Sequence, residues 1–419
     1  MIRFPKLTLA ALFLFPFAAV AAPAAKVTNG NDAGPGSLRQ ALIDKETKIM
    51  IVGSVGTITL NSTLVYEGTE PLKIIGSGQT IDGTATGQDP VLEITMGADL
   101  TVSNLTFDGG DSLTQWDMPA GGKGVFVNVP TTRTGTVKVD LSNVAIMNTG
   151  NHGLHVSDCT DGDDCGEGEG SGGDGSTASV YVKLNSVLVD SAGIGIADRD
   201  GVRVDERNEG DITLVVTNST FVNAGADGLE LDEGNNGDVF VDVRNSTFDN
   251  NGDFCNLGPV PGEDDPCFDE FDDEGVVVVD VDDGFDVDEA GAGTFYGVIR
   301  NTNVTNNKDE GLDFDEQGSG GISIDLIGVY AEANVDQGIK LSEEDDGDVI
   351  ATLRGVVSQN NDDLTIEEEN AGDLEATVTG STINETLEVE QEQEPGDTGT
   401  LKVRGSSISA IAPVNVIEI

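Results

Sequence analysis

The sequence contains few positive charges and few aromatic rings. Its 419 residues include 76 acidic and 21 basic side chains, a formal net charge of -55, and only 5% are Phe, Trp or Tyr. A chain with this charge repels nucleic acid and anionic membranes, so neither is an expected partner. Cations, basic partners or a salty medium are the surroundings that the charge favours. The apolar fraction, 37%, still suffices for a core of Val, Ile and Leu.

Histidine and cysteine are also scarce. The chain has two histidines, His152 and His155, and no Cys-x-x-Cys pair, which argues against a zinc site. The cysteines form two local pairs, Cys159 with Cys165 and Cys255 with Cys267. In an exported protein this spacing predicts two disulfides, each closing a loop.

Long apolar runs are absent after the first 20 residues. Arg3 and Lys6 precede an apolar stretch, residues 7–20, that is too short and too interrupted by proline to span a membrane as a mature helix. The small residues that follow fit signal-peptidase cleavage between residues 21 and 25. We therefore predict a signal peptide over residues 1–21, no membrane span, and export to a periplasm or to the outside of the cell.

A six-residue phrase, Gly-apolar-x-apolar-acid-acid, recurs along the chain. Successive copies from Gly284 to Gly311 and from Gly311 to Gly338 are 27 residues apart, as are those from Gly201 to Gly228. Looser copies begin at Asp363 and Thr386. A fixed period of this size predicts a solenoid in which each unit stacks on the next. The alternation of apolar and polar residues within the phrase predicts a short strand with one buried face.

Each unit also carries a turn residue between two strands. The turn column consists of Asn104, Asn143, Asn185, Asn218, Asn245 and Asn301, continued by Gly328, Gly355, Gly380 and Gly405. Asn and Gly tolerate a left-handed backbone, so we predict a tight bend at each of these positions. Stacked Asn side chains can also hydrogen-bond from one coil to the next. A unit of about three short strands and three turns predicts one coil of a parallel β-solenoid.

The start of the mature chain carries a family resemblance. Asp32–Leu42, followed by Gly56–Leu60 and Ile75–Gly83, resembles the N-terminal segment of secreted right-handed parallel β-helix proteins of the pectin-lyase-like superfamily. The Asn turn column is similar to the asparagine ladder of that fold. Residues 37–43 have the pattern of a short amphipathic helix that could close the first coil.

The resemblance implies an all-β fold, a right-handed parallel β-helix with three short strands per coil and an N-terminal helical cap. We expect one domain over residues 26–419, with loop insertions near residues 159–176 and 253–274. The resemblance does not imply one activity, because this fold hosts lyases, hydrolases, epimerases, adhesins and scaffolds.

Stacking the phrases places acidic side chains in columns. Leu229 and Leu231 point inward, so Glu230 and Asp232 point outward. At a coil spacing of about 4.8 Å, two like charges repel by roughly 3.5 kcal/mol at an effective dielectric constant of 20. Such columns must raise pKa values, bind cations or depend on salt. Oxygen ligands suit Ca²⁺. The predicted metal ligands are Asp205, Asp232, Glu233, Asp288, Glu289, Asp315 and Glu316, and the loops 158–174 and 280–289 are further calcium candidates.

The same columns hold side chains that an enzyme could use. A glycoside hydrolase needs a proton-donating acid and a second carboxylate across the bond. A polysaccharide lyase needs a basic proton acceptor beside a calcium-bridged uronate. Arg203 could instead neutralise Glu230 on the next coil. The candidate catalytic residues are the acids Glu230, Asp232, Asp286 and Asp313 and the basic residues His155, Arg203 and Lys340.

Three functions remain open from the sequence. The leading hypothesis is a secreted or periplasmic scaffold or binding protein whose acidic columns bind divalent cations, with a glycan or a cell-surface component as a further ligand. The second is a polysaccharide lyase or glycoside hydrolase that acts on the outward face of one sheet. The third is an inert, salt-adapted β-helix.

Overall fold

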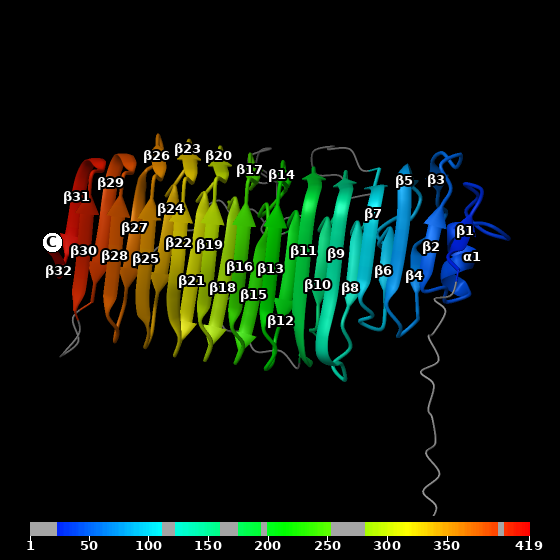
Figure 1. Ribbon diagram of the computed structural model, residues 1–419, viewed down its shortest axis with the longest axis horizontal. Coiled ribbons are helices and arrows are strands. Elements are labelled where there is room, and N and C mark those ends of the chain that lie inside the picture. Colours follow the sequence, from blue (N-terminus) through cyan, green and yellow to red (C-terminus); the bar gives the residue numbers. More distant parts are fainter. Residues whose placement is uncertain (1–22, 111–121, 160–174, 194–198, 253–280, 393–397) are drawn as a thin grey trace, which may run out of the picture.

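The chain folds into a long stack of coils. The structure, a computed structural model, describes residues 23–110, 122–159, 175–193, 199–252, 281–392 and 398–419. Its strands lie across the long axis of the molecule and are stacked side by side along it (Figure 1). The strand pairs between coils are parallel. Parallel strands joined by crossover connections wind in a right-handed sense. The expected right-handed parallel β-helix is therefore confirmed.

Three faces, each a column of strands, surround the core. The first face contains β4 (Leu64–Tyr66), β6 (Leu92–Ile94), β8 (Val125–Asn128), β10 (Leu154–Ser157), β12 (Val202–Glu206), β15 (Glu230–Asn235), β18 (Phe285–Gly291), β21 (Leu312–Gly318), β24 (Ile339–Glu343) and β27 (Asp363–Glu368). The second face contains β1 (Ala25–Val27), β2 (Lys48–Ile51), β13 (Ile212–Thr217), β16 (Val239–Arg244), β19 (Phe295–Arg300), β22 (Gly321–Ile327), β25 (Asp348–Arg354), β28 (Leu374–Thr379), β30 (Gly399–Arg404) and β32 (Val416–Glu418). The third face contains β3 (Ile58–Thr59), β14 (Thr220–Val222), β17 (Thr247–Asp249), β20 (Asn303–Thr305), β23 (Tyr330–Glu332) and β26 (Val357–Gln359).

Longer strands bend from one face to the next. Four of them join the second face to the third, and two, near the C-terminal end, join the third face to the first. They are β5 (Leu72–Asp82), β7 (Leu100–Asp108), β9 (Thr134–Met147) and β11 (Thr177–Asp190), then β29 (Thr382–Gln391) and β31 (Ser407–Val414).

One helix closes the N-terminal end of the stack. Helix α1 (Leu38–Ile43) begins after Ser37, whose side chain accepts a hydrogen bond from the backbone N–H of Gln40 at 3.2 Å. Leu38 and Leu42 are buried, and the helix packs against β1, β2 and β4. The helical cap expected over residues 37–43 is confirmed, and it covers the first sheet edge.

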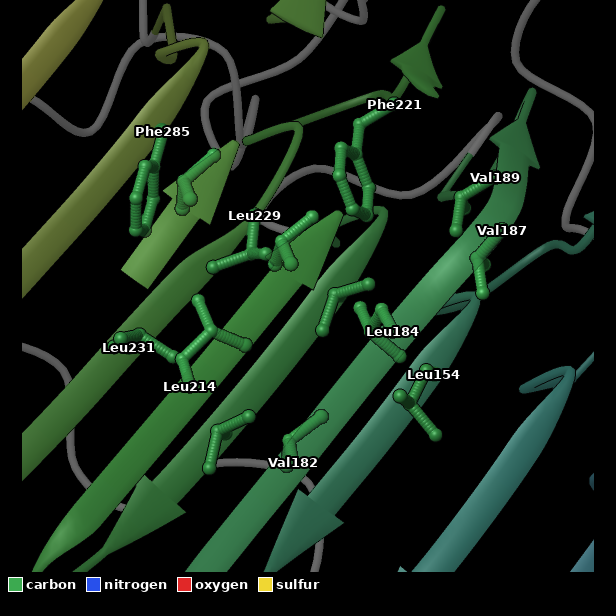
Figure 2. Close-up of a cluster of buried hydrophobic side chains, with 14 of the residues drawn as sticks. Leu154, Val182, Leu184, Val187, Val189, Leu214, Phe221, Leu229, Leu231 and Phe285 are labelled. Carbon is green, nitrogen blue, oxygen red and sulfur yellow. The ribbon is translucent and has the colours of Figure 1, made fainter. Parts of the chain in front are cut away.

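The core is a continuous column of aliphatic side chains. Alternate residues of each strand point inward, as Leu229 and Leu231 do beside Leu214 (Figure 2). Phe221 and Phe248 stack from coil to coil with ring centroids 4.9 Å apart, and the stack continues to Phe285 at 5.3 Å. Because successive coils carry similar side chains at equivalent positions, each core side chain packs on a similar side chain of the next coil.

The predicted turn column adopts the left-handed backbone with one exception. Nine of its ten members have positive φ, among them Asn104 at 56° and Gly355 at 62°. The exception is Asn185, because the left-handed residue of that coil is Ser186, with φ 56°. The prediction for Asn185 was therefore wrong by one residue, and Asn185 pairs with Ser142 as an ordinary strand residue.

A second asparagine ladder lies inside the stack and has no counterpart in the predicted turns. Asn251 donates its side-chain N–H to Oδ1 of Asn307 at 3.0 Å, Asn307 to Asn334 at 2.9 Å, and Asn334 to Asn361 at 3.1 Å. Each donor asparagine also donates its backbone N–H to the same acceptor oxygen, as when the Asn307 N–H donates to Oδ1 of Asn334 at 3.2 Å. The ladder thus pairs polar groups that would otherwise be buried without partners.

Several predictions concern residues outside the described part. The signal peptide, most of both insertions, and Cys165, Cys255 and Cys267 lie there. Cys159 is not a free thiol, but the pairing of the four cysteines stays a prediction. In the described part of the chain, no helix is long and apolar enough to cross a membrane.

Candidate functional site

The predicted acidic columns run along the first face in the expected register. Arg203 lies opposite Glu230, Glu230 opposite Asp286, and Asp286 opposite Asp313. The next outward column follows in the same way from Asp205 through Asp232, Asp288 and Asp315. Both columns point away from the core, yet much of their length is buried. Arg203 is 7% exposed, and Asp205 is 1% exposed.

Arg203 neutralises the N-terminal part of this surface. Its guanidinium lies 2.7 Å from Glu230, 2.8 Å from Asp205 and 3.2 Å from Asp232. Arg207, also buried, contacts Asp232 as well. Burial alone would raise the pKa of Asp205, but Arg203 and His155 hold that pKa far below its usual range. The predicted role of Arg203, to neutralise Glu230, is confirmed by this contact, and Asp205 and Asp232 belong to the same ion-pair network.

Both histidines of the chain lie beside Arg203. The rings of His152 and His155 are 4.7 Å apart, and His155 Nε2 lies 2.6 Å from Oδ2 of Asp205. Burial, and then the charge of Lys123, lower the pKa of His155 to about 4. The imidazole is therefore neutral at pH 7, with Nε2–H donating to the ionised carboxylate of Asp205.

Lys340 bounds the same surface on the C-terminal side. Its ammonium Nζ lies 3.1 Å from Oδ2 of Asp313 and 3.1 Å from Oδ2 of Asp315. Burial alone would lower the pKa of Lys340, but these carboxylates raise it above its usual value. Lys340 is therefore a permanent charge that neutralises one of the two neighbouring aspartates.

Between Arg203 and Lys340 lies a cluster of carboxylates, the central cluster, formed by Asp283, Asp286 and Asp313. Each residue offers an oxygen atom, and these atoms lie within 4.8 Å of one another. Oδ1 of Asp313 is buried and accepts no hydrogen bond. Burial first, and then neighbouring carboxylates, raise the pKa of all three groups well above the usual range. The ionised cluster is thus strongly disfavoured unless a proton or a cation compensates it.

Two further groups of carboxylates adjoin the central cluster. Asp283 is also close to Asp309 and Glu310, and Asp286 is close to Glu230 and Asp288. In both groups the oxygen atoms again lie within 4.8 Å. The acidic surface is therefore continuous across β15, β18 and β21.

Asp283 belongs to a column that the sequence analysis missed. Asp200, Asp227, Asp283 and Glu310 each precede the glycine of a repeated phrase. Oδ1 of Asp283 accepts the backbone N–H of Glu310 at 2.7 Å, and Oδ1 of Asp227 accepts that of Asp283 at 2.6 Å. The signal was present in the sequence as an acid at the same place in four copies.

The predicted metal ligands divide into three groups. Asp205 and Asp232 are engaged by arginine, and Asp315 lies beside Lys340. Asp288 alone of the seven belongs to one of the groups of close carboxylates. Glu233, Glu289 and Glu316 lie on the core side of the first face. The further candidate loop, residues 280–289, contains Asp283 and Asp286 of the central cluster.

The glutamates on the core side form a ladder, the interior glutamate ladder. Its members are at most 1% exposed and stack in register from coil to coil. Burial, and then the neighbouring acids, raise the pKa of Glu233 to about 11, and burial raises that of Glu343 to about 9. At neutral pH such carboxyl groups share protons along the column. The ladder consists of Glu206, Glu233, Glu289, Glu316, Glu343 and Glu368, and Gln391 occupies the next position.

Comparisons with known proteins find likeness in fold only. No family model matches the chain, and no curated protein matches it. Among solved structures, it is similar to the enzymatically active domain of tailspike protein 2 from bacteriophage CBA120, with 14% identity and a TM-score of 0.44 over 81% of this chain and 44% of that chain. The chain thus spans less than half the length of the tailspike chain.

A second solved structure with some likeness is the catalytic domain of a GH87 alpha-1,3-glucanase in complex with nigerose. The identity is 12% and the TM-score 0.23, over 97% of this chain and 69% of that chain. The parallel pairing of the strands themselves establishes the architecture, a parallel β-helix.

Proposed function

We propose that the protein is an exported β-helix binding protein whose first face holds divalent cations, with Ca²⁺ as the preferred ion. The observation that carries the proposal is the central cluster of Asp283, Asp286 and Asp313. Three buried or half-buried carboxylates share one small space, and the only basic side chain on them among the described contacts is Lys340.

The ligand chemistry and the distances both suit Ca²⁺. Oxygen atoms that bind one Ca²⁺ at about 2.4 Å are at most about 4.8 Å apart. The oxygen atoms of the central cluster meet this limit. Ca²⁺ takes oxygen ligands in flexible geometry, and the cluster offers no nitrogen or sulfur ligand that would favour a transition metal. Asp283, Asp286 and Asp313 would hold the ion, and water would complete its coordination.

A titration of the mature protein tests this proposal. After chelation, we expect sub-millimolar Ca²⁺ to raise the melting temperature more than Mg²⁺ or NaCl at matched ionic strength, because the ion binds the folded state. Asp286→Asn should abolish the Ca²⁺ effect. Asp346→Asn, which changes an exposed aspartate outside the clusters, is the matched control. Equal stabilisation by every salt would overturn the proposal and favour a salt-adapted β-helix.

Cleavage of a polysaccharide is the second candidate function. Asp286 and Asp313 lie on adjacent coils, and both have raised pKa values, so one can carry a proton while the other is ionised. A protonated acid beside a carboxylate is the pair that glycosidic hydrolysis requires. Release of reducing sugars that is lost in Asp313→Asn but retained in Asp346→Asn would support this activity.

A further inference from the structure

The second face carries a stacked aromatic pair in an otherwise aliphatic and polar surface. Phe240 of β16 and Tyr296 of β19 occupy paired positions on neighbouring coils. Their rings are 5.2 Å apart and nearly parallel, at 8°. Phe240 is 37% exposed and Tyr296 is 43% exposed, although each ring would bury far more apolar surface if it pointed into the core. The pair lies on the second face, whereas the carboxylates described above lie on the first face, and the two sites share no residue.

Small residues flank the pair on both sides. Thr213 precedes Phe240 in the column, and Ser323 follows Tyr296. Because the two rings stack on each other, their outer faces look toward these short side chains. The next position beyond Ser323 is Ile350, which is 48% exposed. Two coils separate Tyr296 from Ile350, a distance of about 9–10 Å.

The space above Ser323 is thus a slot with an aromatic wall and an aliphatic wall. It belongs to a shallow groove of about 420 Å³ that runs across β13, β16, β19, β22 and β25. Polar groups line the same groove, namely the hydroxyl groups of Ser323 and Thr352 and the carboxylate of Asp325. The carboxylate of Asp242, also in the groove, forms an ion pair with the guanidinium of Arg244 at 2.6 Å.

We propose that this groove, the aromatic groove, binds a neutral polysaccharide through a pyranose ring that stacks on Tyr296. One face of a pyranose ring presents C–H groups that pack on an aromatic ring, and its edge presents hydroxyl groups that need hydrogen-bond partners. A ring stacked on Tyr296 fills a slot of this width and meets Ile350 on its other face. Ser323, Thr352 and Asp325 lie where they can bind the hydroxyl groups.

Charge selects the class of sugar. The chain has a formal net charge of -55, and Asp325 lines the groove itself. An anionic glycan would be repelled, whereas a neutral glycan is not. A purely apolar partner would leave Asp325 buried against it without a counter-charge, which is costly. The chemistry of the groove therefore favours a neutral sugar over an apolar peptide.

Binding at the aromatic groove is independent of the cation site proposed for the first face. The experiment is isothermal titration, with tyrosine fluorescence in parallel, against a panel of neutral and uronate-rich polysaccharides, with and without chelator. We expect saturable binding of a neutral polysaccharide that chelator leaves unchanged. Tyr296→Ala should weaken the binding at least tenfold. Ser323→Phe keeps Tyr296 but fills the slot, and it should weaken the binding to a similar extent.

Val335→Ala changes an exposed apolar residue outside the groove and should bind like the unaltered protein. Binding that survives both groove variants would overturn the proposal, as would the absence of binding to any neutral polysaccharide in the panel. A change of oligomeric state in Tyr296→Ala, without sugar binding, would show instead that a second copy of the chain covers the groove. Loss of Ca²⁺ binding alone would not affect this proposal.

Discussion

Arg203 joins Glu230 across two coils of the stack, with 2.7 Å between the guanidinium Nη1 and the carboxylate Oε2. The same guanidinium holds Asp205 and Asp232, so one side chain compensates several buried acids. Removing one partner from such a network leaves the others charged and buried, which commonly costs about 3–5 kcal/mol.

We therefore predict that Arg203→Met lowers the free energy of unfolding by about 3 kcal/mol or more. Urea denaturation at pH 7 measures this change. Lys402→Met is the matched control, because Lys402 pairs with Glu375 at 2.6 Å in a partly exposed position on the surface. Exposed ion pairs contribute less than about 1 kcal/mol, so a similar loss in both variants would contradict the central role of Arg203.

Lys340 should compete with divalent cations for Asp313 and Asp315. We predict that Lys340→Gln raises the affinity of the first face for Ca²⁺ about tenfold, because removing a nearby positive charge adds roughly 1.4 kcal/mol to cation binding. Calorimetric titration with Ca²⁺ checks this prediction. An unchanged or lower affinity would show that the ion does not bind beside Lys340.

The interior glutamate ladder predicts a loss of stability at high pH. Burial raises the pKa of Glu343 from 4.5 to about 9. A raised pKa in the folded state stabilises the protein fully below pH 4.5, and this contribution is lost as the pH rises toward 9. We predict that Glu343→Gln makes the protein more stable than the unaltered chain at pH 8 to 9, by about 1–2 kcal/mol, with little difference near pH 4.

Thermal melts across this pH range compare Glu343→Gln with Glu209→Gln, a change at an exposed glutamate. The amide is expected to fit, because Gln391 already occupies the position after Glu368 in the same column. A stability difference that is the same at both ends of the pH range would argue against a shared-proton ladder.

The two asparagine ladders should differ in their contribution to stability. Asn334 is buried and bonds to Asn361 at 3.1 Å, whereas Asn245 is exposed and lies 3.5 Å from Asn218. We predict that Asn334→Ala costs about 2–3 kcal/mol, since it leaves buried polar groups without partners. Asn245→Gly keeps the left-handed backbone and should cost less than about 1 kcal/mol in the same urea measurement.

The outward columns could be predicted because strand alternation and a constant period fix the register. Glu230, Asp286 and Asp313 align as expected for that reason. The interior position of Glu233, Glu289 and Glu316 was not predicted, because these acids were grouped with the outward aspartates as metal ligands. Glu233 is two residues after Leu231 and four after Leu229, so strand alternation places all three side chains on the core side, and Glu233 is indeed buried.

Other features depend on contacts between coils that no single copy of the phrase reveals. Asp283 joins the central cluster through its place before a glycine, outside the strand pattern. The shift from Asn185 to Ser186 arose because both residues suit a turn, and only pairing with Ser142 on the preceding coil decides between them. The aromatic groove was missed because Phe240 and Tyr296 are far apart in the chain and adjacent only once the coils stack.

In the turns that follow the interior glutamates, the backbone of one coil lies directly against the backbone of the preceding coil. A Cβ atom built on Gly320 would lie 1.4 Å from the carbonyl oxygen of Gly293 on the preceding coil. With no side chains between them, successive coils meet through identical main-chain surfaces. Gly284, Gly311 and Gly338 follow one another at intervals of 27 residues. Duplicating or deleting one such interval would therefore keep the columns in register, so the length of the rod and the number of outward carboxylates on its first face can change together in whole coils.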